Sequence, residues 1–455
     1  MFLVNICNYI LFVLYFVYYS KKIIKEVIGL NIKKVVVIGA TGAVGKTVSG
    51  IFASFGNAEV YMLGRDLKKL EKAKKEAALS VKAITVMDNL FVDLIDNLEK
   101  YVRGADLIFE SVAEDLKIKK EIHTEVNKYI SNDAIVSSGT SGLSIDVLAD
   151  CYDDYKKSNF FGIHFFNPPY SLPLCELIPS KYNENNKTFI NDVKNYLNNV
   201  LLRNTIVVKN EPAFLANRIG FMFMNEALQY AEKYKDYGGI DFIDSILGCF
   251  TGRNMKPLET IDFVGLDIHK SIVDNVRFNS KENDKESFVL PNFVDNLIKE
   301  GLLGLKTEGG LYKTVDNKRM VYDINSKEYR EVIKYNFYYV ENVLNELACG
   351  NYKEGYDLIK KDPSLESDIC ITFMLKYIIY SLNVTKNICD DIASCDIAMA
   401  DGFNWLPPLA MIEALGGNKE LVKLCKKYLK MDVGSLFDNL PKSKYDYRKF
   451  IKARV

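Results

Sequence analysis

The feature that most constrains this 455-residue chain is a β-branched run that leads directly into a glycine-rich loop. The run occupies residues 35–38, and the loop that follows contains Gly39, Gly42 and Gly45. A strand that is apolar at every position is buried on both faces, which is typical of a parallel sheet covered by helices. The chain is therefore expected to begin its fold with a strand, a tight turn and a helix of Rossmann type.

Short apolar strands continue to alternate with charged helices over the first 210 residues. Further strands are expected at residues 59–63, 107–109, 135–136, 162–164 and 206–208, with helices at 47–55 and 67–79. Strands that alternate with helices join through right-handed crossovers into one parallel sheet. The expected fold class is an α/β, doubly wound Rossmann-type sheet that spans residues 31–209.

The strand pattern ends near Pro212, and helical patterns continue to the C-terminus. A long helix is expected over residues 214–235, and the polar stretch 315–327 predicts a linker or a surface excursion. We therefore expect an all-α region at residues 210–320 and a second, divergent helical region at 321–455.

The two helical regions share an internal echo. Asp244 precedes Pro257 by thirteen residues, and Asp396 precedes Pro408 by twelve. Each pair spans an apolar helix and a glycine, and each proline is followed by leucine. The shared order of features predicts that one helical unit was duplicated.

Composition argues against several classes of partner and site. Basic and acidic residues both number 59, so no net charge recruits nucleic acid. The nine cysteines form no CxxC pair and are odd in number, which favours a reducing, cytoplasmic compartment over a disulfide framework. Only three histidines are present, so we expect no metal site.

The N-terminal segment 1–30 is distinct from the rest of the chain. Residues 2–19 are strongly apolar and about long enough to reach the lower limit for crossing a bilayer. Lys21 and Lys22 follow and would keep the folded body on the cytoplasmic side. An anchor at the inner face of a membrane, a start assigned too far upstream and a helix packed on the body all stay open.

The glycine loop predicts a dinucleotide site, because its glycines let a pyrophosphate approach the N-terminus of the following helix. An acidic residue is expected roughly 20 residues further on, where it would bind the adenosine ribose. The second strand instead ends in Gly64, followed by Arg65 and Asp66. Arg65 could pair with a 2′-phosphate, while Asp66 could bind the ribose or cap the next helix. The choice between NAD and NADP therefore stays open.

His164 ends a predicted strand, and Glu176 follows twelve residues later. Alcohol oxidation needs a base for the hydroxyl proton, and a carboxylate on the second ring nitrogen would fix the tautomer. A histidine among aromatic residues is as commonly a satisfied core residue. Ser141 in a serine-rich turn and Asn217 on an apolar helix could likewise line a crevice or serve only as turn and packing residues.

Together these segments resemble the 3-hydroxyacyl-CoA dehydrogenase family, from Lys33 to about Lys313. The matching stretches are residues 106–120, 135–145, 162–176, 212–226, 257–267 and 300–312. The resemblance implies an L-3-hydroxyacyl-CoA dehydrogenase of the fatty-acid β-oxidation type, acting on acyl-CoA with NAD as the family's cofactor. Nothing in the chain resembles an enoyl-CoA hydratase domain.

The resemblance also implies roles for individual residues. It makes His164 the catalytic base and Glu176 its carboxylate partner, and it makes Ser141 the residue that bonds the substrate oxygen. Asn167 and Asn217 match asparagines that position the substrate, its thioester and the cofactor.

Two further positions, Glu114 and Lys119, match residues near the nicotinamide ribose and CoA. The second helical region looks like the extra domain of fused family members, where it stands in for a partner subunit, so a monomer or a homodimer is implied. The chain departs from the family at Gly139 and Gly142, which replace an asparagine and a serine, and at Gly64 in place of the ribose-binding acid.

Two other functions remain open from the sequence. One is an NADP-dependent dehydrogenase of the same fold that acts on a free β-hydroxy acid or sugar acid, as Arg65 suggests. The other is a non-catalytic dinucleotide-binding protein, tethered to a membrane through residues 2–19. The glycine loop, which has one residue more than the family's usual pattern, motivates both alternatives.

Overall fold

The computed structural model describes residues 29–281 and 285–454, which divide into two compact units. The first unit runs up to Thr140 and resumes over Ile145–Val207. The second comprises Ser141–Ser144 and the chain from Val208 onward. Segment 2–19, with the membrane contact expected of it, lies outside the described residues. Within the described ranges no helix combines the length and the apolar character needed to cross a membrane.

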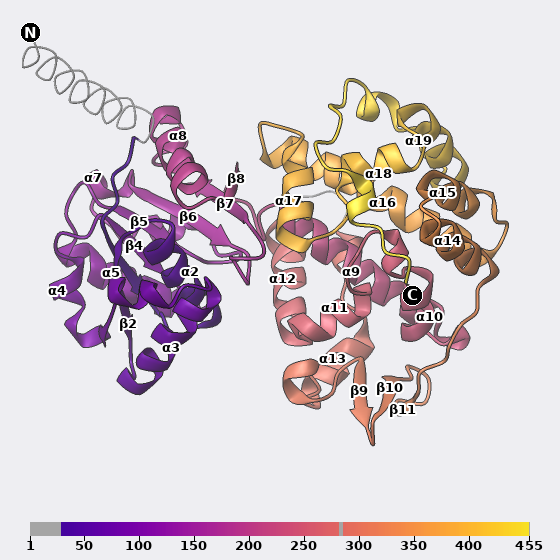
Figure 1. Cartoon of the computed structure of the whole chain (residues 1–455), viewed down its shortest axis with the longest axis horizontal. Helices are drawn as coiled ribbons and strands as arrows, with labels where there is room; N and C mark the ends of the chain where they lie inside the picture. Colours follow the sequence, from indigo (N-terminus) through magenta and orange to yellow (C-terminus); the bar gives the residue numbers. More distant parts are fainter. Residues whose placement is uncertain (1–28, 282–284, 455) are drawn as a thin grey trace, which may run out of the picture. The chain divides into compact units, whose positions relative to one another are not determined.

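An eight-stranded sheet forms the centre of the first unit (Figure 1). Its strands are β1 (Lys34–Ile38), β2 (Glu59–Gly64), β3 (Leu90–Leu94), β4 (Leu107–Glu110), β5 (Ile135–Ser138), β6 (Phe160–Phe165), β7 (Leu174–Pro179) and β8 (Asn204–Val207). The spatial order is β3-β2-β1-β4-β5-β6-β7-β8, and every neighbouring pair is parallel except β6 and β7. The order reverses between β1 and β4, which is where open α/β sheets bind ligands. The doubly wound Rossmann-type prediction is confirmed.

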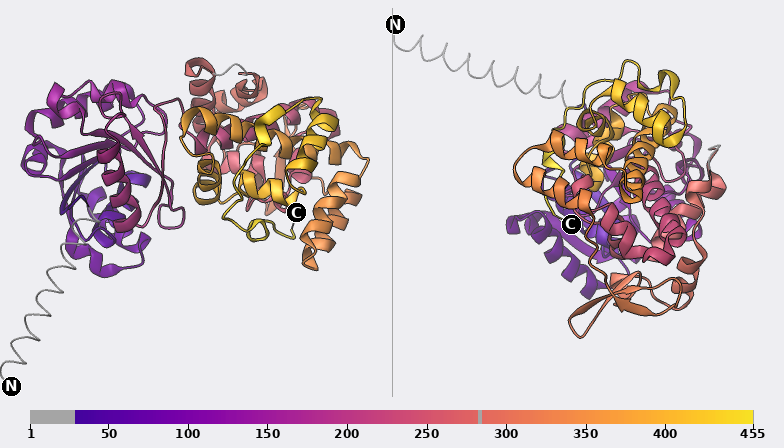
Figure 2. Two further views of the ribbon diagram at one scale, coloured as in Figure 1. Left: turned by 90° about the horizontal axis from the view of Figure 1, so that it is seen from above. Right: turned by 90° about the vertical axis from the view of Figure 1, so that its right-hand side faces the viewer.

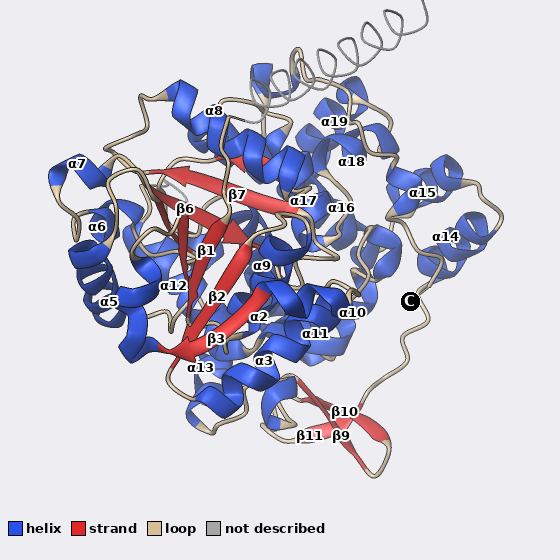
Figure 3. Ribbon diagram, turned by 60° about the vertical axis from the view of Figure 1, so that its left-hand side comes forward, coloured by secondary structure: helices blue, strands red, loops and turns tan. Residues whose placement is uncertain are grey.

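Helices cover the sheet because its strands are apolar on both faces (Figure 3). They are α2 (Ala43–Ser54), α3 (Leu67–Ser80), α4 (Leu98–Val102), α5 (Leu116–Tyr129), α6 (Ile145–Ala149), α7 (Asp154–Lys157) and α8 (Lys187–Asn195). Val35 and Val37 of β1 pack in one core with Phe52 of α2. Val36 and Ile38 point to the opposite face, since side chains alternate along a strand, and are equally inaccessible.

Two strands of this sheet, β3 and β7, do not appear among the predicted strands. The edge strand β3 is mostly half-exposed and contains Asp93, so its apolar pattern is weak. In β7 a fully buried Glu176 interrupts the apolar run. A buried charge needs a partner from elsewhere in the fold, and a single strand's pattern does not show that partner.

The second unit is mainly helical, and the regions expected at residues 210–320 and 321–455 both lie in it (Figures 1 and 2). Its helices are α9 (Ala216–Lys233), α10 (Ile240–Ile246), α11 (Pro257–Val264), α12 (Leu266–Asn279), α13 (Asn292–Lys299), α14 (Tyr338–Ala348), α15 (Tyr352–Lys361), α16 (Leu365–Ile388), α17 (Ser394–Phe403), α18 (Pro408–Ala414) and α19 (Asn418–Leu424). Helix α9 packs on α16 and α17, and α16 also packs on α10 and α18. The two regions therefore share one core.

The echo between these regions is also present in the hydrogen bonds. The Asp244 carboxylate accepts the Leu258 N–H at 2.9 Å, and the Asp396 carboxylate accepts the Leu409 N–H at 2.8 Å. Each aspartate thus fixes the start of the helix that its proline begins. Burial raises the pKa of Asp244 to about 7.

The same positions of the two regions contact each other. Gly252 and Asn404 each lie eight residues after the repeated aspartate, and both have left-handed backbone conformations. The residues that follow them are Arg253 and Trp405, and the guanidinium carbon of Arg253 lies 4.6 Å from the centre of the Trp405 ring. Arg253 is fully buried and also stacks on Phe223 at 3.8 Å.

Residues 315–327 do not form a linker, because residues 315 and 318–322 belong to a three-stranded antiparallel sheet. The alternative prediction, a surface excursion, agrees with the exposed hairpin that these residues form. The strands are β9 (Tyr312–Val315), β10 (Lys318–Tyr322) and β11 (Tyr329–Glu331). Asp316 and Asn317 join β9 to β10 with positive φ values of 49° and 62°. Two consecutive residues with positive φ make the turn whose twist suits a two-residue hairpin, so the polar residues form a turn.

Candidate active site

The glycine loop after β1 is shaped for close backbone approach. Gly39 has φ +84°, and a Cβ there would lie 2.4 Å from the Ser111 carbonyl oxygen. A Cβ on Gly45 would lie 2.6 Å from the Gly39 carbonyl oxygen. Gly42 caps α2 without a side chain, so no side chain occupies the N–H groups of the first turn. These features fit the pyrophosphate of a dinucleotide, which such a helix start attracts.

At the carboxyl end of β2 the structure places Gly64 inside the fold and Arg65 on the surface. The carboxylate of Asp66 accepts the Lys69 N–H at 3.1 Å and caps α3. Asp66 was expected either to bind the adenosine ribose or to cap the next helix, and in the structure it caps the helix. Arg65 has no hydrogen-bond or ion-pair partner in the part of the chain that the structure describes.

His164 and Glu176 face each other across the only antiparallel pairing in the eight-stranded sheet. The register of β6 against β7 sets His164 opposite Glu176. The Nδ1 atom of His164 lies 2.7 Å from Glu176 Oε2, and Glu176 is fully buried. The ring also meets the edge of Phe166, with centroids 4.6 Å apart. Because a carboxylate only accepts, Nδ1 carries the hydrogen, and Nε2 is the proton-accepting nitrogen of the neutral ring.

A second buried acid, Glu110, ends β4, and no feature of the sequence had marked it as functional. Its Oε1 atom accepts from Lys119 Nζ at 2.8 Å, and its Oε2 atom accepts from Ser138 Oγ at 2.6 Å. Glu110 and the Lys119 side chain are almost wholly inaccessible, at 0% and 1%. This charged network joins the carboxyl ends of β4 and β5. It lies next to the glycine loop, because the backbone of Ser111, the residue after Glu110, approaches Gly39 closely.

The charge of Glu110 is strongly stabilised. Burial by itself would raise its pKa, but His123, whose Nε2 lies 3.4 Å from Oε2, and the Lys119 ammonium group lower the pKa to about 2. His123 is fully buried, and its other nitrogen lies 2.8 Å from the Tyr152 hydroxyl. His123 is therefore a core residue of this network.

The structure brings Glu114 and Lys119 together, as two of the residues expected near the cofactor. Lys119 Nζ lies 3.4 Å from Glu114 Oε2, and Glu114 Oε1 accepts from Thr140 Oγ1 at 2.5 Å. The Glu114 side chain is 43% exposed, whereas Lys119 is buried behind it. In this conformation Glu114 is the member of the pair that can contact a ligand, and Lys119 holds it in place.

The remaining predicted residues lie in different units. Asn167 is exposed just after β6 in the first unit, whereas Ser141 and Asn217 belong to the second. Asn217 lies in the first turn of α9 and is 8% exposed.

Gly139 and Gly142, where the chain departs from the family it resembles, are both closely packed by neighbouring side chains. A Cβ on Gly139 would lie 2.7 Å from the Phe109 ring, and one on Gly142 would lie 2.8 Å from Asn275 Nδ2. That amide donates to the Gly142 carbonyl at 3.0 Å. Neighbouring side chains thus fill the space that the family's larger residues would need.

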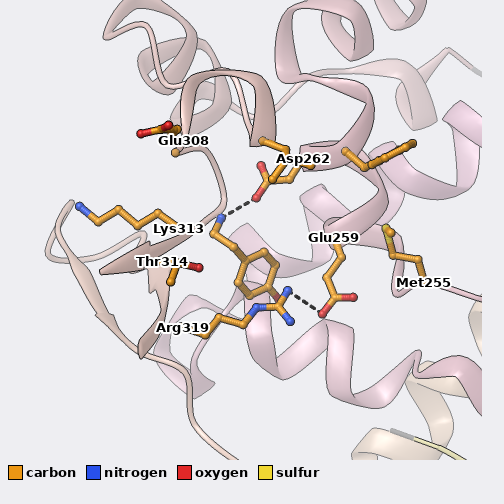
Figure 4. Close-up of a pocket in the computed structure, with 11 residues that line it drawn as sticks. Met255, Glu259, Asp262, Glu308, Lys313, Thr314 and Arg319 are labelled. Atoms are coloured by element: carbon orange, nitrogen blue, oxygen red, sulfur yellow. Dashed lines mark hydrogen bonds and ion pairs between the residues drawn. The ribbon is translucent and has the colours of Figure 1, made fainter. Parts of the chain in front are cut away.

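A pocket of about 610 Å³ lies wholly within the second unit, between α11 and the β9–β10 hairpin (Figure 4). Arg319 crosses it to Glu259 at 2.7 Å and stacks on Tyr312. Asp262 accepts the N–H groups of Leu311 and Tyr312 at its floor, and burial raises its pKa to about 6. No predicted site residue lines this pocket, so it is separate from the candidate active site.

Comparison with known families gives consistent matches over most of the chain. Residues 34–211 match the family described as "3-hydroxyacyl-CoA dehydrogenase, NAD binding domain". Residues 214–314 match "3-hydroxyacyl-CoA dehydrogenase, C-terminal domain". The two matches are consecutive, and together they cover the sheet, the glycine loop and the first helical region.

Individual relatives agree with these matches. A probable 3-hydroxyacyl-CoA dehydrogenase of Bacillus subtilis is 32% identical over 360 residues, which cover 79% of this chain and 44% of that protein. One of Deinococcus radiodurans is 30% identical over 306 residues, covering 64% of this chain and 85% of that protein. The crystal structure of 3-hydroxybutyryl-CoA dehydrogenase from Escherichia coli shares the fold, with a TM-score of 0.66 at 18% identity, covering 89% and 96% of the two chains. This chain spans less than half the length of the Bacillus relative.

Proposed function

The chain belongs to the 3-hydroxyacyl-CoA dehydrogenase family, a family of NAD-dependent oxidoreductases, and we propose that it interconverts 3-hydroxyacyl-CoA and 3-oxoacyl-CoA. The observation that carries the proposal is the His164–Glu176 pair, with its 2.7 Å hydrogen bond at the end of β6. A base held by a buried carboxylate is what the oxidation of a secondary alcohol requires.

In the proposed reaction His164 moves the proton of the C3 hydroxyl. A nicotinamide cofactor, held by its pyrophosphate at the glycine loop of Gly39, Gly42 and Gly45, would supply the acceptor for the hydride from the C3 carbon. His164 Nε2 takes the proton of the C3 hydroxyl, while Nδ1 keeps its hydrogen bond to Glu176. The carboxylate fixes the orientation of the ring and stabilises the imidazolium that forms. The roles of Ser141, Asn167 and Asn217 stay predictions that rest on the family resemblance.

Oxidation of NADH or NADPH at 340 nm with acetoacetyl-CoA as substrate tests the proposal. The H164A variant should lose roughly 10²- to 10⁴-fold in kcat, which is the range that a positioned general base contributes. NADH binding and the far-ultraviolet circular dichroism spectrum should stay unchanged. Near-normal turnover by H164A would remove the histidine from the mechanism.

The E176Q variant tests whether Glu176 orients the His164 ring or only fills space. The substituted amide keeps the size of the Glu176 side chain but not the charge that stabilises the imidazolium. We expect kcat to fall and its pH profile to shift while KM changes little. A variant with unchanged kcat and pH profile would show that Glu176 is only a packing residue.

The substrate class is tested by comparing acetoacetyl-CoA with free acetoacetate. Equal rates on the two would favour a free β-hydroxy acid, and dinucleotide binding without turnover of either would favour a binding-only protein. We also propose a cytoplasmic location, supported by the scattered cysteines, and a monomer, supported by the core that the two helical regions share. Cell fractionation and light scattering of the full chain test both, and fractionation also tests the membrane contact predicted for residues 2–19.

A further inference from the structure

The adenosine end of the cofactor site does not match what NAD requires. Rossmann sites that select NAD place an Asp or Glu near the end of the second strand, where its carboxylate binds the ribose 2′-hydroxyl. Here β2 ends in Gly64, which has no side chain. The pyrophosphate end of the site fits a dinucleotide, so the disagreement is confined to the ribose.

Neighbouring carboxylates do not supply the missing group. Asp66 caps α3 through the Lys69 N–H. Asp93 lies beside Leu63 on the adjacent strand β3. It accepts the Tyr101 hydroxyl at 2.6 Å and Asn97 Nδ2 at 2.9 Å. These hydrogen bonds, that of Tyr101 above all, lower the pKa of Asp93. Both carboxylates are therefore committed to protein groups.

The same corner of the unit is instead positively charged. Arg65 is exposed and has no ion pair in the described ranges, and Lys68 and Lys69 follow in the first turn of α3. That turn contains no acidic residue. Cations at a helix N-terminus oppose the helix dipole, and here the single cap carboxylate of Asp66 faces three cations, so a further anion would be favoured.

We propose that this end of the site is built for a 2′-phosphate, which Arg65 binds, so that the chain uses NADP(H) at least as well as NAD(H). A guanidinium group presents a planar fork of N–H donors that matches phosphate oxygens, and an arginine near this position accommodates the 2′-phosphate in NADP-binding Rossmann sites. The inference rests on the proposed function for its reaction. Its binding step is independent of the acyl substrate.

Dinucleotide binding to the full chain tests the proposal without turnover. Titration calorimetry with NADH and NADPH should give an NADPH affinity equal to or higher than that for NADH. The R65A variant should lose roughly tenfold or more in NADPH affinity, as expected when a charge-assisted hydrogen bond to phosphate is removed. Its NADH affinity should stay within about twofold. Lys75→Ala, which removes one exposed charge further along α3, is the matched control and should change neither affinity.

The reciprocal variant G64D restores the missing acid. The atoms nearest to a Cβ on Gly64 would belong to the side chains of Leu70, at 3.2 Å, and Thr41, at 3.5 Å, and both can adjust. A carboxylate there should strengthen NADH binding and repel the 2′-phosphate, which reverses the preference. An unchanged preference in G64D would contradict the assignment of this position.

Two results would overturn the proposal: NADH binding more than about tenfold tighter than NADPH binding to the unaltered chain, or unchanged NADPH binding by R65A. Should R65A fail to fold, titrating the unaltered chain with 2′,5′-ADP and 5′-AMP decides the same point, and equal affinities would refute it. Absence of turnover with acetoacetyl-CoA, together with Arg65-dependent NADPH binding, would reject the proposed function and leave this inference standing.

Discussion

Replacing Glu110 by glutamine should destabilise the first unit more than any exposed charge substitution. Glu110 lies at the end of β4, fully buried, and holds Lys119 and Ser138 through bonds of 2.8 and 2.6 Å. The E110Q variant keeps the shape of the side chain but removes its charge. The ammonium group of Lys119 then stays buried with the more distant Glu114, at 3.4 Å, as its one remaining carboxylate partner.

The size of the expected loss of stability follows from the pKa of Glu110. Its value falls from 4.5 to about 2 on folding, which corresponds to roughly 3 kcal/mol of stabilisation of the charged form at neutral pH. Removing one partner of a buried ion pair costs about 3–5 kcal/mol, which agrees in size. Domains are stable by only about 5–15 kcal/mol, so E110Q should lose a large share of the stability.

The assay is urea unfolding of the full chain and of E110Q, followed by circular dichroism between pH 3 and 8. Because folding lowers this pKa, the stabilisation is complete above about pH 4.5 and disappears as the pH falls toward 2. The difference between the two proteins should therefore be constant at neutral pH and shrink in acid. E99Q, which breaks the exposed Glu99–Arg103 pair, is the control and should change stability by at most about 0.5 kcal/mol. A difference below about 1 kcal/mol for E110Q, or one that grows in acid, would refute the reasoning.

Three further predictions concern other parts of the chain. R253M should destabilise the second unit by a few kcal/mol and shift the fluorescence emission of Trp405, because the guanidinium group packs on that ring. Trp405 is the chain's sole tryptophan, so an unchanged emission spectrum would argue against the contact. D244N should remove a pH dependence, because a pKa raised from 3.8 to about 7 makes the native chain lose stability as the pH rises from about 4 to about 7; an equal difference in unfolding free energy between the two proteins at pH 5 and pH 8 would count against this. G39A should abolish dinucleotide binding measured by calorimetry, since its Cβ would collide with the Ser111 carbonyl; normal affinity would disprove the close approach.

Local patterns were enough to predict most of the sheet and the glycine loop. The buried run at residues 35–38 and the spacing of its glycines depend only on neighbouring residues, so β1 and the start of α2 could be predicted directly. The strand β7 could not, because the charge of Glu176 makes sense only beside His164. The Asp316-Asn317 pair between β9 and β10 is typical of a hairpin turn and could have indicated one. The polar residues around it gave the stretch no strand pattern.

The candidate site was predictable to a similar extent. The twelve-residue spacing of His164 and Glu176, together with the family resemblance, indicated the pair that the register brings together. Glu110 was missed because an acid at the end of an apolar strand resembles an ordinary strand terminus. Its partners Lys119 and Ser138 are nine and 28 residues away, so only the folded sheet brings the three together.

The contact between Arg253 and Trp405 limits how the second unit could have been assembled. The two residues occupy the same position of the two repeated regions, nine residues after Asp244 and Asp396. In a symmetric pair of identical copies, a position that meets its own counterpart faces the same residue, so arginine would oppose arginine and repel it. A chain that carries both regions can place a cation against an aromatic ring. The two positions are thus complementary, and the first region could not pair with a copy of itself through this contact.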